Sequence, residues 1–178
     1  MRAIIEPLVG VKFEKHELRF GMERYEIEEF LGVSDDEEFD RDTGYVSVNY
    51  NSRSAGLSLE YENDLLVSVQ FSSESYIKPE LFGKDIFSTD CDEIIALLNE
   101  HDPGGIENDD DVEYTSRRLK LSFWREESPK DFKRYLSDMR ANGRDPRRVK
   151  HREEVEQARL GSTRFALFTC AAQNFKIF

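Results

Sequence analysis

Clustered carboxylates are the residues in this sequence whose types and spacing could do chemistry. They form two acidic runs, one after each of two predicted helices, with these members: Asp35, Asp36, Glu37, Glu38, Asp109, Asp110 and Asp111. A catalytic carboxylate pair needs environments that push its two pKa values apart, whereas these runs are uniformly hydrophilic. The second run also lacks the spaced ligands, central glycine and terminal glutamate of an EF-hand. The runs therefore favour binding to a basic partner, and solubility alone is the alternative explanation of their charge.

Other catalytic and metal-binding patterns are missing from the sequence. There is no glycine-rich phosphate loop and no serine or cysteine in a recognisable nucleophile elbow. The histidines His16, His101 and His151 are far apart and have no second ligand at metal spacing. Cys91 and Cys170 are too few for a disulfide framework or a zinc site. We expect no catalytic activity, no metal and no cofactor.

The charge is unevenly distributed along the 178 residues, which have a net charge of −12. Residues 1–129 hold 13 Lys and Arg against 31 Asp and Glu, a net charge of −18. Residues 130–178 hold 12 against 6, a net charge of +6. An acidic body repels nucleic acid and anionic membranes and attracts basic proteins, so we expect a basic protein partner. Oligomeric state cannot be inferred from these features.

The sequence also bears on localisation. It has no apolar stretch approaching the roughly 20 residues that span a bilayer, and its N-terminus MRAIIEPLVG lacks the apolar region of a signal peptide. We therefore expect a cytoplasmic protein.

A pattern of helix, acidic run and strands occurs twice. Leu18–Leu31 and Phe87–Leu98 align at an offset of 67 residues, which places Ile27 over Ile94. The first predicted helix ends at Gly32, and the second begins after Ser88 or Thr89. Each acidic run is then followed by a hairpin-like segment, YNSRSAGLSLEY and YTSRRLKLSFW. Two tandem repeats explain this pattern, and chance similarity of two short helices is the alternative.

Alternating polar and apolar residues predict strands at Tyr45–Tyr50, Leu57–Tyr61 and Leu65–Phe71, with a turn over Asn51–Gly56. An antiparallel sheet with one polar and one apolar face follows. The predicted fold is α+β, with two repeats of a short helix packed on an antiparallel sheet. We expect a single compact domain over 1–178, with repeat one at about 7–77 and repeat two at about 82–178.

A helical insertion is predicted within repeat two, at 128–161. Ser128-Pro129 and Asp145-Pro146 each read as a helix start, Asn142-Gly143 closes the first helix, and Gly161 ends the second. The insertion contains a basic run made up of Arg140, Arg144, Arg147, Arg148, Lys150 and Arg152. Such clusters can neutralise phosphates, but without interleaved aromatics and beside an acidic body we favour a solvated helix face.

The N-terminal half resembles a known fold. The run Pro7-Leu8-Val9-Gly10-Val11, then Leu18-Arg19-Phe20-Gly21-Met22, Glu26-Ile27 and Leu31-Gly32, is similar to the opening of repeats in the beta-lactamase-inhibitor-protein-like fold. Similar sequences occur among bacterial immunity proteins, including those that neutralise contact-dependent growth inhibition toxins. The resemblance covers about residues 7–72 well and 82–128 loosely, and Ser88 replaces Gly21 in the second copy.

The resemblance implies an immunity protein that binds and neutralises a toxin, and the acidity favours a basic nuclease as that toxin. Clustered carboxylates on a rigid sheet compete with nucleic acid for a basic cleft. We expect both acidic runs to frame one negative surface that a basic partner binds. If the partner binds elsewhere, the alternatives are the basic insertion and the exposed sheet face, with Tyr50 and Tyr61 as aromatic anchors. An intracellular adaptor or scaffold domain without a toxin partner is the alternative.

Overall fold

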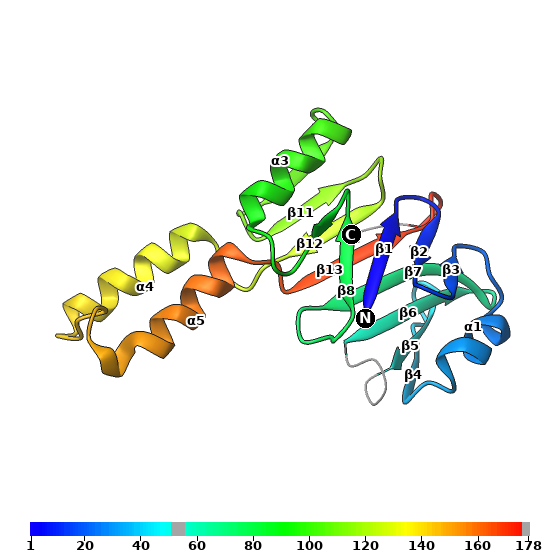
Figure 1. Cartoon of the computed structure of the whole chain (residues 1–178), viewed down its shortest axis with the longest axis horizontal. Helices are drawn as coiled ribbons and strands as arrows, with labels where there is room; N and C mark the ends of the chain where they lie inside the picture. The colour runs from blue at the N-terminus through cyan, green and yellow to red at the C-terminus, as the bar shows by residue number, and fades with distance from the viewer. Residues whose placement is uncertain (51–55, 176–178) are drawn as a thin grey trace.

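Two β-sheets and four α-helices make up the part of the chain that the computed structural model describes, residues 1–50 and 56–175 (Figure 1). The fold is mixed α and β with mainly antiparallel sheets, as the alternation pattern predicts. The predicted turn over Asn51–Gly56 falls largely outside the described residues.

The larger sheet has eight strands in the order β10-β11-β12-β13-β7-β6-β5-β4. Its strands are β4 (Asp36–Phe39), β5 (Val46–Tyr50), β6 (Leu57–Glu62), β7 (Leu65–Ser72), β10 (Ile106–Asp109), β11 (Glu113–Ser116), β12 (Leu121–Trp124) and β13 (Leu167–Ala171). Every neighbouring pair in this sheet is antiparallel, and the two four-strand groups meet where β13 pairs with β7.

The smaller sheet has five strands in the order β3-β2-β1-β8-β9. Its strands are β1 (Arg2–Glu6), β2 (Gly10–Lys12), β3 (Glu17–Arg19), β8 (Lys78–Leu81) and β9 (Lys84–Asp85). Its β1 and β8 run parallel, so a segment near the N-terminus lies beside one that follows β7. β1 occupies the centre of this sheet.

The helices are α1 (Arg24–Leu31), α3 (Cys91–His101), α4 (Pro129–Ala141) and α5 (Arg152–Thr163), with a 3-10 turn η1 (Val149–His151) before α5. The apolar residues of α1, α3, the smaller sheet and one face of the larger sheet join in a single hydrophobic core. Ile27 of α1 and Ile94 of α3 are both fully buried in it. The core therefore lies on one side of the larger sheet.

Helix boundaries follow local capping chemistry. α1 ends as predicted, at Gly32 with φ 84°, and the amide of Gly32 donates to the carbonyl of Glu28. α3 begins one or two residues later than predicted, because the Asp90 side chain rather than Ser88 or Thr89 accepts from the amide of Asp92.

In the predicted insertion, α4 begins at the Ser128-Pro129 signal, with a reciprocal cap between Ser128 and Asp131. The Asp145-Pro146 prediction is wrong, because Asp145 caps a turn through the amide of Arg147 and α5 begins only at Arg152. The predicted stop at Gly161 is wrong too, because α5 continues through Gly161 to Thr163. α4 and α5 pack on each other as an antiparallel hairpin that projects away from the sheets (Figure 1).

Candidate functional site

The larger sheet has a second face, opposite the core, which we term the open face. Most of its side chains are polar, and two, Trp124 and Leu167, are not. The polar ones are Ser47, Asn49, Ser58, Glu60, Ser68, Gln70, Glu113, Ser122 and Thr169. Helices α1 and α3 pack on the core side, so neither covers this face. The alternation that buries one set of side chains leaves the other available for contact.

Strand register aligns the open face in rows that cross the whole sheet. One row begins at Asp36 on β4, passes through Asn49, Ser58, Gln70, Thr169, Ser122 and Thr115, and ends at Glu107 on β10. Hydroxyl and amide groups occupy the middle of the row and a carboxylate lies at each end. Side chains that are direct cross-strand partners point to the same side of a sheet.

A hollow of about 400 Å³ lies in the open face, and we term it the open-face hollow. Its described lining includes three carboxylates and three aromatic rings, which are Asp40, Glu60, Glu113, Tyr45, Trp124 and Phe175. Within that described lining there is no Lys, Arg or His. The hollow is therefore negatively charged and has aromatic walls.

Glu60 and Ser68 lie side by side in the lining of this hollow. They are direct partners across β6 and β7, and Ser47 is the partner of Glu60 on β5. Burial raises the pKa of the Glu60 carboxyl, while the neighbouring hydroxyls of Ser68 and Ser47 oppose that rise and the charge of Asp40 adds to it. No cationic side chain of the described ranges contributes to this pKa.

The Ser68 hydroxyl is a buried polar group in the lining of the hollow. Ser68 is only 1% exposed, and its Oγ makes no hydrogen bond of ordinary geometry, although it lies close enough to Glu60 to lower that carboxyl's pKa. Buried hydroxyls normally have a partner, because an unmade hydrogen bond costs free energy.

One wall of the hollow comes from the chain after β13. The ring of Phe175 packs against that of Tyr45 with centroids 5.1 Å apart. The backbone carbonyl of Phe175 accepts a hydrogen bond of 2.8 Å from Nζ of Lys120. These contacts hold Phe175 against the open face, where it is 8% exposed.

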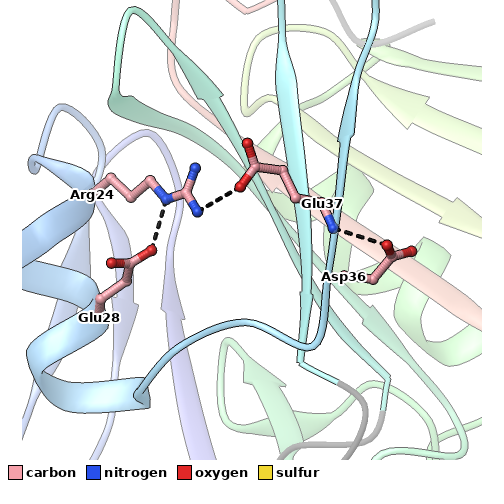
Figure 2. Close-up of polar contacts among 4 residues, drawn as sticks. All are labelled: Arg24, Glu28, Asp36 and Glu37. Atoms are coloured by element: carbon pink, nitrogen blue, oxygen red, sulfur yellow. Dashed lines mark hydrogen bonds and ion pairs between the residues drawn. The ribbon is translucent and has the colours of Figure 1, made fainter.

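The first acidic run does not form a loop. Asp36–Phe39 is the edge strand β4, and alternation directs Asp36 and Glu38 to the open face and Glu37 to the other side. Arg24 of α1 donates to Glu37 at 2.7 Å and to Glu28 at 2.7 Å. Figure 2 shows its guanidinium group between the two carboxylates. The guanidinium lowers the pKa of the Glu37 carboxyl. Glu37 therefore fastens the edge strand to the helix. Asp35 precedes β4, and its amide bonds to the carbonyl of Asn49.

The second acidic run forms the tight turn between β10 and β11. Asp110 and Asp111 both have positive φ, 50° and 57°, which aspartate tolerates better than most residues. Asn108 exchanges two hydrogen bonds with Asp111, so part of this acidity serves the turn itself. Asp109 is the partner of Glu113 and belongs to the open face.

The two acidic runs lie at opposite edges of the larger sheet. Seven strand spacings separate β4 from β10, which is roughly 34 Å along the sheet. The runs therefore do not merge into one patch. Instead, Asp36, Glu38 and Asp109 bracket the open face from its two sides.

The expectation that Tyr50 and Tyr61 lie on an exposed face is wrong. They are 2% and 0% exposed, because they share the alternation phase of Val48 and Leu59 and so point into the core. Neither hydroxyl makes a hydrogen bond of ordinary geometry, and the guanidinium of Arg24 lies 5.9 Å from the Tyr61 ring centroid. These tyrosines are part of the hydrophobic core.

The aromatic groups that do reach the open face were not predicted from the sequence. Trp124, Tyr45 and the aliphatic Leu167 line the hollow. Leu167 precedes the buried Phe168 on β13, so alternation places the two side chains on opposite faces of the sheet. The available signal was the polar phase of the same strands, in which Glu60 and Ser68 alternate with buried residues.

The chain was compared with known protein families, curated proteins and solved structures. No known family, curated protein or solved structure matches the chain. In the described ranges, no cluster of three or more His, Cys, Asp or Glu could hold a metal ion, and no helix there is long and apolar enough to cross a membrane.

Proposed function

We propose that this protein is a cytoplasmic immunity protein, which binds a basic toxin through the open face and blocks it. The observation that carries the proposal is the composition of that face: hydroxyl, amide and aromatic groups in a rigid eight-stranded sheet, with carboxylates in the hollow and along both edges. A basic nuclease active site must be shielded from nucleic acid, and an acidic face both competes for that site and speeds encounter.

The arrangement of elements supports a duplicated origin for the fold, which is part of the proposal. α1 is followed by four antiparallel strands, β4 to β7, and α3 by β10, β11, β12 and β13. The two groups meet at the antiparallel pair β7 and β13, and α4, η1 and α5 fall between β12 and β13. We infer two tandem repeats, the second with a helical insertion, as in the fold that the N-terminal motif resembles.

The proposal is tested by co-expression. The full chain is expressed with the toxic C-terminal segment of a secreted protein encoded immediately upstream of its gene. We expect growth to be restored and the two proteins to co-purify. Continued growth arrest, with this protein soluble and folded, would contradict an immunity function and would favour an adaptor without a toxin partner.

A further inference from the structure

The open-face hollow has the chemistry of a site for an organic cation. Carboxylates supply the counter-charge, and no cationic side chain of the described lining competes for it. Aromatic faces attract a guanidinium or ammonium group through the ring quadrupole. Tyr45, Trp124 and Phe175 provide such rings from three separate parts of the chain.

Ser68 gives a second, independent observation that points to a ligand site in the hollow. Its hydroxyl is almost fully buried and makes no hydrogen bond of ordinary geometry, although it lies close enough to the partly buried Glu60 carboxylate to lower that group's pKa. Both groups can accept hydrogen bonds. A guanidinium group carries five N–H donors and no acceptor, so one such group can satisfy Ser68 and Glu60 together.

A metal ion would suit the hollow less well. The described carboxylates of its lining come from the β4–β5 connection, from β6 and from β11, and they do not form a group of three that could hold a metal. Hard cations also take a shell of oxygen ligands, whereas aromatic rings occupy part of this wall.

We propose that the open-face hollow binds a guanidinium group, with the Glu60 carboxylate as its counter-ion and the Ser68 hydroxyl as a second acceptor. The natural source is either an arginine side chain presented by a protein or a free small guanidinium compound. Naming a toxin as that protein rests on the proposed function, whereas binding of the group itself does not.

The test uses the full chain and its single tryptophan, Trp124, which lines the hollow and reports binding by fluorescence. The probe is N-acetyl-arginine methylamide at constant ionic strength, and the matched neutral analogue is the citrulline compound. We expect a saturable change with the arginine probe in the millimolar range, as a ligand of few atoms allows, and binding at least about tenfold weaker with citrulline. Agmatine distinguishes the sources: tighter binding of agmatine identifies a free compound, and tighter binding of the peptide mimic identifies a protein side chain.

Glu60→Gln removes the counter-ion and should lower the affinity for the arginine probe about tenfold. Glu153→Gln on α5 is the matched control, because it makes the same change far from the lining, and it should leave affinity unchanged. Ser68→Ala should also weaken binding of the arginine probe, by a smaller factor than Glu60→Gln. Three results would overturn the site. They are citrulline binding as tightly as the arginine probe, Glu60→Gln binding the arginine probe as tightly as the wild type does, and no saturation by the arginine probe up to about 50 mM. Toxin protection without probe binding would overturn this site alone, and probe binding without protection would overturn only the immunity proposal.

Discussion

Glu60 and Ser68 are direct cross-strand partners on the open face, so a partly buried carboxylate lies beside a buried hydroxyl that makes no hydrogen bond of ordinary geometry. A stable core does not require this pair, because both residues point away from the apolar side of the sheet. The pair is instead arranged to accept hydrogen bonds from outside the chain.

Replacing Glu60 should therefore weaken binding without weakening the fold. Burial is the main reason that the pKa of the Glu60 carboxyl is raised in the folded state. A raised pKa means that the folded state favours the protonated carboxyl, so this contribution to stability is lost as the pH rises through the raised pKa. At pH 7 the ionised Glu60 is unfavourable, and Glu60→Gln should have an equal or higher free energy of unfolding. The difference should shrink below about pH 4, where the unfolded carboxyl is protonated too.

Urea denaturation at both pH values measures this effect. Asp40 and Tyr45 interact electrostatically with Glu60, so a variant near Glu60 would perturb the same environment. Glu153→Gln, which removes a charge far from that environment, is therefore the control. A clear loss of stability at pH 7 in Glu60→Gln alone would mean that the carboxylate is already satisfied within the fold.

Neighbouring residues of β4 should differ sharply in their roles. Glu37 is paired with Arg24, whereas Glu38 points to the open face, so Glu38→Gln should slow association with a basic partner more than Glu37→Gln. Glu37→Gln should cost up to about 1 kcal/mol of stability, since its side chain is 50% exposed. Stopped-flow association at low and high salt separates the variants. Equal slowing by both would indicate that only total charge matters.

Arg125 should be the most sensitive polar residue outside the open face. It is 2% exposed, and its guanidinium donates to the Asp111 carbonyl, the Ser162 carbonyl and the Tyr114 hydroxyl at 2.5, 2.9 and 2.7 Å. Arg125→Ala removes the donor from the buried Ser162 carbonyl and Tyr114 hydroxyl, so we expect a loss of about 2–4 kcal/mol. Chemical denaturation measures it. Arg117→Ala is the exposed control and should cost less than about 1 kcal/mol, and equal losses would refute the anchoring role.

The turn between β10 and β11 should tolerate neutralisation. Changing Asp109, Asp110 and Asp111 together to Asn keeps residues that accept positive φ, and it keeps an oxygen that can bond to Asn108. The melting temperature should be unchanged or slightly raised because like-charge repulsion falls, while association with a basic partner should slow and lose salt dependence. A marked fall in melting temperature would show that the charges themselves hold the turn.

The alternation of polar and apolar residues predicted the central strands of the larger sheet, because each of these strands has one face toward the core and one face toward solvent. The same phase could have placed Tyr50 and Tyr61 in the core. β4 was not predicted, since an edge strand exposed on both faces carries charges without alternation.

The open-face hollow could not be predicted from local sequence. It depends on strand order, which brings Glu60 of β6 and Trp124 of β12 onto one surface, and on Phe175, which folds back over that surface. Such contacts join residues far apart in the chain, and neither periodicity nor capping signals encode them.

Thr169→Arg tests the open face most directly. Thr169 lies in the middle of the cross-sheet row, between Gln70 and Ser122, so an arginine there adds bulk and positive charge to the centre of the proposed binding surface. Gln157→Arg on the exposed side of α5 is the matched control. With a toxin that the wild type binds, titration calorimetry should show Thr169→Arg losing at least about 100-fold in affinity, about 2.7 kcal/mol, while the control is unchanged. Wild-type affinity in a folded Thr169→Arg variant would show that the partner binds elsewhere.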